Sequence, residues 1–269
     1  MNRITQKLQA LKQEGRKALV TYIVNGDPSP DVTLAALNTM VEAGADILEI
    51  GVPFSDPMAE GQVIQRGHER ALAHGTSLRD TLALVKTFRE KNQETPVVLM
   101  GYANPVERMG YDQFADAAAE AGVDGLLTVD LPPEEAEDLH SRLRARGLES
   151  IFLLAPTSSE ARVKRVAELA GGFIYYVSLK GVTGASHLDI GSVKEKLELI
   201  SRHSQLPVMV GFGIKDGISA RAVSGFSDGV VVGSALVDIM GSGHALVQIL
   251  DGLRLKVASI RAALDQNSK

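Results

Sequence analysis

Residues 45–61 read ADILEIGVPFSDPMAEG, an apolar stretch that encloses one glutamate and runs into a turn-rich segment. The first half is a near-continuous apolar run rather than an alternation of polar and apolar residues. Such runs are typical of parallel strands that are buried on both faces. Comparable runs recur along the chain, and together they are Ala18–Val24, Ala45–Val52, Pro96–Tyr102, Gly125–Leu131, Ser150–Pro156, Phe173–Leu179, Pro207–Gly213 and Gly229–Ala235.

Helical patterns separate these runs. Residues 29–31 (Ser-Pro-Asp) supply an N-cap, a first-turn proline and an acid, and the pattern that follows ends at Gly44. Residues 157–160 (TSSE) predict a capping box before another helix. Alternating strands and helices favour a parallel sheet, and eight strands close a barrel. An open doubly wound sheet is the alternative, but no GxGxxG follows the first strand, so we expect an α/β fold, a single (β/α)8 TIM barrel.

The segment between the second and third runs is unusually long. Residues 53–75 are turn-rich at first and then helical through His74, before a further helix at about Ser77–Lys91. An enlarged loop after a barrel strand lies on the C-terminal face, where active sites are built. The opening residues, MNRITQKLQALKQEGRK, predict an N-terminal amphipathic helix. Because no composition shift divides the chain, we expect one domain over residues 1–269.

Composition excludes several classes of function. The 28 Lys and Arg against 33 Asp and Glu give a formal charge of −5, whereas a nucleic-acid binder needs a basic face for phosphates. The absence of cysteine excludes disulfides, thiol nucleophiles and thiolate metal sites, and the 6 histidines show no metal-ligand spacing. Neither a signal region nor a membrane-length apolar run is visible, so we expect a cytoplasmic protein without membrane contact.

Glu49 is the clearest candidate for chemistry. It lies near the end of the second run among apolar residues, where burial raises the pKa of a carboxyl group unless a structural ion pair compensates. Glu60, in the enlarged loop, could reach the same pocket. Asp130 could be a catalyst or a helix cap, and we expect Asp56 to fold the loop through an Asx turn. Three tyrosines lie on predicted strands, namely Tyr22, Tyr102 and Tyr175. Each could line the pocket or pack in the core, and core packing is favoured for Tyr22.

Three glycine-containing turns predict a phosphate site. Lys180–Gly184 (KGVTG) follows the sixth run, Gly211–Gly213 ends the seventh, and Gly233 with Ser234 ends the eighth. Backbone N–H groups in such turns, together with a helix beginning near Ser234, can cradle a phosphate. The glycines that bound the first turn are also typical of a lid hinge. Lys180 could instead form a Schiff base, but it lies outside any apolar run that would desolvate it.

Several of these stretches together resemble the tryptophan synthase alpha chain family. They are ILEIGVPFSDPMAEG, the NGDP turn at residues 25–28, GVTG after the sixth run, GFG and GSA, and the resemblance extends over nearly the whole chain. It implies a lyase that cleaves indole-3-glycerol phosphate to indole and glyceraldehyde 3-phosphate by a retro-aldol reaction. It also implies no metal or organic cofactor on this chain, and a pyridoxal-phosphate beta chain as partner in an αββα heterotetramer.

The resemblance assigns roles to residues by position. Glu49 falls on the general acid/base that protonates the indole carbon bearing the side chain, and Glu60 falls on the second acid, which handles the indole N–H. Tyr175 falls near the reacting hydroxyl, and Thr183 on a loop residue that closes onto the second acid. The remaining assignments are Gly184, Gly213, Gly233 and Ser234 at the phosphate, and Tyr102 and Phe212 near the indole.

The enlarged loop departs from the usual family motif Ala-Asp-Gly-Pro, because residues 59–62 read Ala-Glu-Gly-Gln. Glu60 keeps the acid but moves its carboxyl group by about 1.5 Å at full extension. A displacement of that size can lower a rate about a hundredfold. Gln62 replaces a rigid proline, which favours a more mobile loop. These departures leave open a phosphate-binding regulatory subunit without catalysis. A Schiff-base aldolase acting through Lys180 is a separate alternative.

Overall fold

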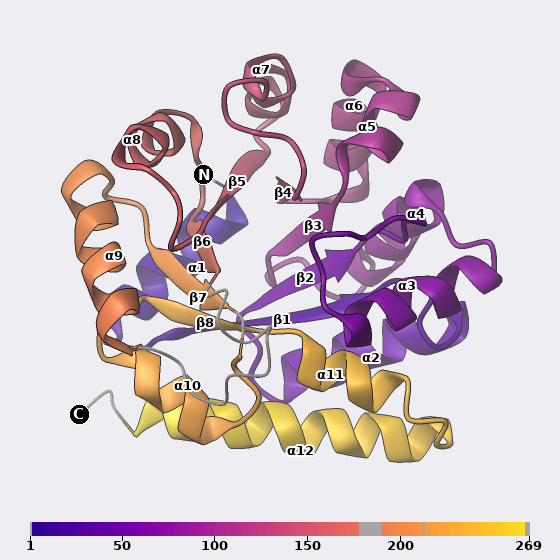
Figure 1. Ribbon diagram of the computed structural model, residues 1–269. Coiled ribbons are helices and arrows are strands. Elements are labelled where there is room, and N and C mark those ends of the chain that lie inside the picture. Colours follow the sequence, from indigo (N-terminus) through magenta and orange to yellow (C-terminus); the bar gives the residue numbers. More distant parts are fainter. Residues whose placement is uncertain (1, 178–189, 212, 267–269) are drawn as a thin grey trace.

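The computed structural model describes residues 2–177, 190–211 and 213–266. Over these residues the chain forms a closed barrel of eight parallel strands in sequence order, which confirms the predicted (β/α)8 fold (Figure 1). The strands are β1 Ala18–Val24, β2 Ile47–Gly51, β3 Val97–Gly101, β4 Gly125–Thr128, β5 Glu149–Leu154, β6 Ile174–Val177, β7 Val208–Gly211 and β8 Gly229–Val232.

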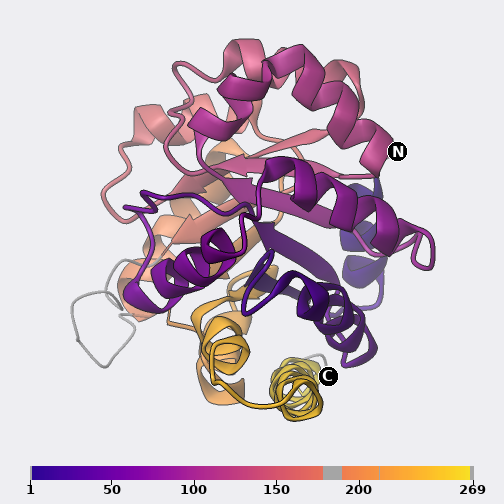
Figure 2. The same ribbon diagram turned by 90° about the vertical axis from the view of Figure 1, so that its right-hand side faces the viewer.

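Helices pack on the outer side of the strands, and α12 is seen end-on in Figure 2. The N-terminal helix and the enlarged segment after β2, which carries α3 and α4, are present as expected. The described helices are α1 Arg3–Gln13, α2 Pro30–Glu42, α3 Gln62–Ala73, α4 Leu78–Arg89, α5 Ala103–Met109, α6 Tyr111–Ala121, α7 Glu137–Ala145, α8 Glu160–Leu169, α9 Ile190–His203, α10 Gly217–Ser224, α11 Ser234–Met240 and α12 Leu246–Asp265.

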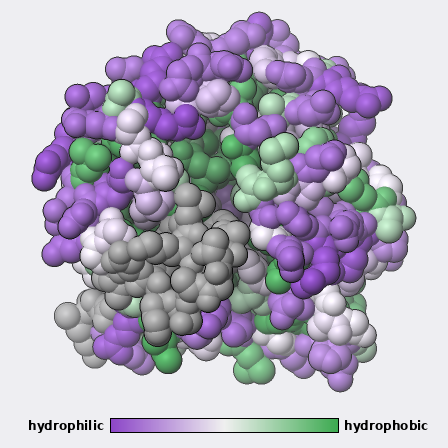
Figure 3. Space-filling view, in the orientation of Figure 1, coloured by the Kyte–Doolittle hydropathy of each residue, from purple (hydrophilic) through white to green (hydrophobic). Residues whose placement is uncertain are grey.

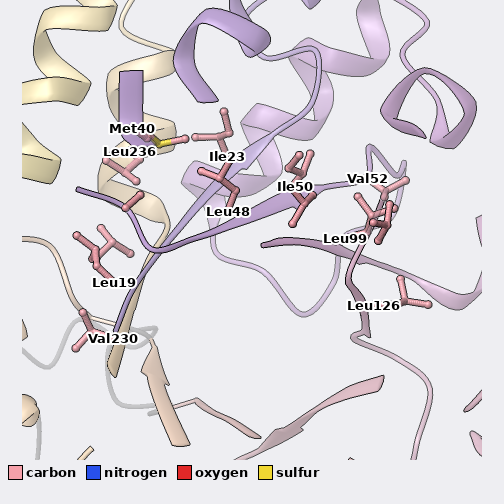
Figure 4. Close-up of a cluster of buried hydrophobic side chains, with 14 of the residues drawn as sticks. Leu19, Ile23, Met40, Leu48, Ile50, Val52, Leu99, Leu126, Val230 and Leu236 are labelled. Atoms are coloured by element: carbon pink, nitrogen blue, oxygen red, sulfur yellow. The ribbon is translucent and has the colours of Figure 1, made fainter. Parts of the chain in front are cut away.

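Each strand divides its side chains between two cores, as the continuous apolar runs predict. In β1, Leu19 and Ile23 belong to the outer core between strands and helices, where they lie near Met40 of α2 (Figure 4). Val20 points the other way, into an inner core that α1 completes with Ile4. The helix α1 therefore closes the N-terminal end of the barrel and leaves the C-terminal end for the site.

Three aspartates tie strands together at the N-terminal end. Asp46, Asp124 and Asp228 each stand directly before an even-numbered strand. Each carboxylate accepts the backbone N–H of a residue near the start of the preceding strand, at 2.8 or 2.9 Å. Arg261 pairs with Asp46 at 3.0 Å, and Arg89 pairs with Asp124 at 2.7 Å. These bonds hold the end of the barrel opposite the site.

The predicted capping box at residues 157–160 was wrong in its position. The N-cap of α8 is Ser159, whose hydroxyl accepts the N–H of Arg162 at 3.2 Å. The hydroxyl of Ser158 accepts the N–H of Ala155 instead, so it closes the turn after β5. Within the described residues, no helix combines the length and apolar character needed to cross a membrane.

Candidate active site

A cavity of about 540 Å³ lies at the C-terminal ends of the strands. The space-filling view shows a recess near the centre of the molecule with hydrophobic residues at its sides (Figure 3). Strand residues and the turns that follow β4, β5, β7 and β8 line the cavity, and two carboxyl side chains enter it. The lining residues used below are Tyr22, Glu49, Glu60, Tyr175, Arg162, Gly213, Gly233 and Ser234.

Glu49 supplies a protonated carboxyl group inside the barrel. It pairs in register with Tyr22 of β1 and Val98 of β3, and only 1% of its surface is exposed. Neither carboxyl oxygen has a hydrogen-bond partner among the described residues. Burial, and then the nearby charge of Glu60, raise the pKa of Glu49 to about 8. At neutral pH this side chain therefore holds a proton that it can donate.

Glu60 reaches the same cavity from the loop between β2 and α3, and it is 7% exposed. Its Oε2 lies 2.7 Å from Nε2 of His68, although off the direction of a good N–H bond, so Oε2 has no well-directed hydrogen bond in the described structure. Its Oε1 lies 3.5 Å from the Tyr22 hydroxyl. The structure thus brings Glu49 and Glu60 together, with a tyrosine and a histidine at the second carboxyl group.

The loop that carries Glu60 is fastened at both ends. The ring of Phe54 stacks on Tyr102, with centroids 4.9 Å apart, and its backbone N–H donates to Nδ1 of His68 at 3.1 Å. The Tyr102 hydroxyl accepts the N–H of Ala59 at 3.2 Å. Gln65 of α3 donates to the carbonyl of Glu60 at 2.8 Å. Tyr102, which the resemblance assigned to the indole, is not among the residues that line the cavity, and its hydroxyl fixes Ala59, the residue next to Glu60.

The tyrosines of the cavity are neutral phenols. Burial raises the pKa of Tyr175 well above its usual range, and the charges of Glu49 and Glu60 add to this effect. Burial and the same two carboxyl groups also raise the pKa of Tyr22. Core packing was the favoured interpretation for Tyr22, but its side chain is buried and also lines the cavity.

Two of the glycine turns also line the cavity. Gly213, with φ of +79°, Gly233 and Ser234 line it, and α11 begins at Ser234, so the first N–H groups of that helix have no acceptor within the helix. Arg162 of α8 also lines the cavity, which the sequence analysis did not anticipate. Four other residues singled out from the sequence lie outside the described residues: Lys180, Thr183, Gly184 and Phe212.

Asp130 and Asp56 have local roles. Asp130 accepts the N–H of Ala103 at 2.7 Å, so it caps α5 rather than the helix that follows it in the chain. The Asx turn expected at Asp56 was wrong. The carboxylate of this exposed residue accepts a hydrogen bond from the Ser55 hydroxyl, and it is the backbone carbonyl of Asp56 that accepts the N–H of Met58. Neither carboxylate lines the cavity.

His68 was not predicted to be a site residue, because the sequence offered its histidines only as metal ligands and their spacing does not suit a metal. It lies on α3 four residues after Ile64 and three before Ala71, which places all three on one face of the helix. Ile64 lines the cavity and Ala71 is buried. This spacing was the available signal that His68 faces the barrel.

A family model described as tryptophan synthase alpha chain matches residues 8–264. The chain belongs to the tryptophan synthase alpha chain family. A tryptophan synthase alpha chain of Thioalkalivibrio sulfidiphilus is 63% identical over 238 residues, which cover 88% of this chain and 90% of that one. The alpha chain of Burkholderia thailandensis is 52% identical over 269 residues, covering 100% and 99%.

Solved structures of tryptophan synthase agree with this assignment. The alpha subunit from Legionella pneumophila is 46% identical with a TM-score of 0.93, and 99% of each chain is covered. A chain of M. tuberculosis tryptophan synthase is 34% identical with a TM-score of 0.88, covering 98% and 100%. Tryptophan synthase alpha chains cleave indole-3-glycerol phosphate in tryptophan biosynthesis, so this chain is a carbon–carbon lyase.

Proposed function

We propose that the retro-aldol cleavage of indole-3-glycerol phosphate takes place in the cavity between Glu49 and Glu60. The observation that carries this proposal is the buried carboxyl group of Glu49, which is protonated up to about pH 8 and has no competing hydrogen-bond partner in the described structure. A second carboxyl group in the same cavity supplies the paired acids that the reaction needs.

Glu49 acts first as an acid and then as a base. It donates its proton to the indole carbon that bears the glycerol side chain, which ends the aromaticity of that ring and gives an indolenine. The bond from this carbon to the hydroxyl-bearing carbon then breaks, and its electron pair restores the indole. The hydroxyl loses its proton as the aldehyde forms, and the carboxylate of Glu49 takes that proton back. Tyr175, as a neutral phenol, is placed to orient the hydroxyl.

Glu60 accepts the indole N–H and so stabilises the positive charge that develops on the ring nitrogen after protonation. The turns at Gly213 and Gly233, with Ser234 at the start of α11, hold the phosphate together with Gly184. Binding of the phosphate, which is remote from the bond that breaks, holds the indole end of the substrate in position for the reaction. Phe212 is the proposed neighbour of the indole, and Thr183 is the residue that closes onto Glu60. Tyr102, which does not line the cavity, is proposed to shape this end of the site through the loop that it supports.

We further propose that the chain works as one domain in the cytoplasm and needs no metal or organic cofactor of its own. Family membership implies a beta chain as partner. In the proposed αββα assembly, pyridoxal phosphate is bound by the beta chain alone. The loop at residues 53–62 borders the cavity, so contact with a partner at this face would affect the placement of Glu60.

The test is the release of indole from indole-3-glycerol phosphate by the purified chain, with and without a cognate beta chain. Glu49→Gln keeps the shape of the side chain and removes its acid, so we expect a loss of kcat of at least about a thousandfold. Addition of the beta chain should raise the turnover of the unchanged protein. Undiminished cleavage by the Glu49→Gln variant would refute the assigned role, and turnover indifferent to the beta chain would refute the coupling.

A further inference from the structure

His68 and Tyr22 surround the carboxylate of Glu60. All three side chains are buried, and they come from α3, β1 and the loop between β2 and α3. His68 Nε2 lies 2.7 Å from Glu60 Oε2 but off the direction of a straight N–H bond, so a small rotation of either side chain is needed to complete the hydrogen bond. The Tyr22 hydroxyl lies 3.4 Å from Nε2 and 3.5 Å from Glu60 Oε1. The carboxylate is therefore flanked by polar groups from two elements that belong to the barrel itself.

The backbone fixes which nitrogen of His68 faces the carboxylate. The N–H of Phe54 donates to Nδ1, so Nδ1 carries no hydrogen and the imidazole is neutral. The single ring hydrogen is then on Nε2, on the side of Glu60 and Tyr22. An imidazole locked in this form offers a donor to a carboxylate and adds no positive charge to the site.

Glu60 needs such a restraint more than an aspartate does. The family motif has aspartate here, and the glutamate adds one methylene and one further rotatable bond. Its carboxyl group has more positions available and can move by about 1.5 Å. Because rates depend on placement of this order, an unrestrained glutamate would spend much of its time out of position.

We infer that His68 is a positioning residue, which holds the carboxylate of Glu60 at the place where it meets the indole N–H. This inference rests on the role of Glu60 under the proposed function. Tyr22 of β1 lies beside the other oxygen of the same carboxylate, with its hydroxyl 3.5 Å from Oε1. The glutamate, the histidine and the tyrosine thus act as one unit that keeps the carboxylate of Glu60 in place.

Two conservative variants separate this role from anchoring of the loop. Glutamine places its amide nitrogen near the position of Nε2, so His68→Gln keeps a donor for Glu60 and loses the acceptor for Phe54. Asparagine places its polar atoms near Nδ1, so His68→Asn keeps the acceptor and loses the donor. We expect His68→Asn to lower kcat roughly ten- to a hundredfold with little change in KM, and His68→Gln to stay within about threefold of the unchanged protein.

A cycle with Glu60→Asp tests whether the effect passes through the acid. Aspartate withdraws the carboxylate from His68, so His68→Asn should change kcat by less than about threefold in that background. The opposite order, with His68→Gln impaired and His68→Asn active, would show that His68 serves the loop and would overturn the inference. Equal losses in both backgrounds would overturn it as well.

Two further measurements separate a failure of the inference from a failure of the proposed function. Glu60→Gln with unchanged kcat would refute the role of Glu60 itself, and with it any positioning role. Nitrogen-15 NMR of the unchanged chain at pH 7 reports on His68 independently of turnover, with its signals assigned by their loss in His68→Asn. A protonated Nε2 and an unprotonated Nδ1 support the inference, and a hydrogen on Nδ1 overturns it.

Discussion

Glu49 is the residue whose chemistry the fold alters most clearly. Its pKa of about 8 follows from burial among apolar neighbours and from the second carboxyl group of the cavity. Because the protonated form is the proposed catalyst, kcat/KM should fall about tenfold per pH unit above about pH 8. A pH profile of indole release between pH 6 and 10 checks this expectation. A profile flat to pH 10 would contradict it.

A control variant tests whether the fall of kcat/KM above about pH 8, the alkaline limb of the profile, arises from a carboxyl group. Tyr175 also lines the cavity, but burial keeps the pKa of its phenol far above the range of the profile. Tyr175→Phe should therefore lower activity and leave the limb in place. Loss of the limb in this variant would assign it to the tyrosine.

At the residue scale, the sequence identified Glu49 and Glu60 but not the two side chains that lie beside Glu60. Glu49 stands out because an ionisable side chain interrupts an apolar run, and its burial was predictable from that fact alone. His68 and Tyr22 belong to other elements, 46 positions apart in the chain. Both side chains reach Glu60 because α3 packs against β1, and no local sequence pattern predicts how these two elements pack.

At the element scale, the loop at residues 53–62 and the start of α3 place Glu60 in the cavity. Gln62 is the first helical residue, it is exposed, and Gly61 before it has φ of −74° and ψ of 161°. These values suit the residue before a proline, and a first-turn N–H has no acceptor within the helix. Gln62→Pro should thus raise the free energy of unfolding by about 0.5–1 kcal/mol, as measured by urea denaturation.

Gln62→Ala is the matched control for this prediction. It removes the glutamine side chain without adding the ring, so it should leave stability almost unchanged. A loss of stability in the proline variant would mean that the N–H of residue 62 has an acceptor or that the ring clashes with the loop.

At the element scale, the strands were predictable because parallel strands buried on both faces require continuous apolar runs. The start of α8 was not, since Thr157, Ser158 and Ser159 all have side chains that can cap a helix. The choice of Ser159 depends on where the turn after β5 places the backbone. The side chain of Ser158 is already used by that turn.

For the whole molecule, stability and chemistry reside at opposite ends of the barrel. Asp124 joins Arg89, Arg3 and the N–H of Val97 at the N-terminal end, and burial lowers the pKa of Arg89 to about 10 despite this carboxylate. Asp124→Ala would leave a buried guanidinium without its partner, at a cost of about 3–5 kcal/mol in unfolding free energy. Denaturant unfolding measures the loss, and kcat at a temperature where the variant is folded should not change.

Asp228→Ala is the control for this contrast. Asp228 makes the same kind of bond to a neighbouring strand but is exposed, so its removal should cost only about 1 kcal/mol. Equal losses for the two variants would show that the backbone bond, and not the buried arginine, sets the stability of this end. The number of strands was predictable from eight apolar runs, whereas these cross-strand bonds depend on barrel closure.

The carboxyl oxygens of Glu49 have no hydrogen-bond partner among the described residues, and this affects how the sequence can change over generations. A carboxyl group buried without partners lowers folding stability as pH rises, because the unfolded chain releases the proton near its ordinary pKa and the folded chain retains it to about pH 8. Random substitution screened only for heat resistance would favour losing this glutamate. A cell that must make its own tryptophan would favour keeping it. Selection for protein stability and selection for tryptophan synthesis therefore act on the codon of Glu49 in opposite directions.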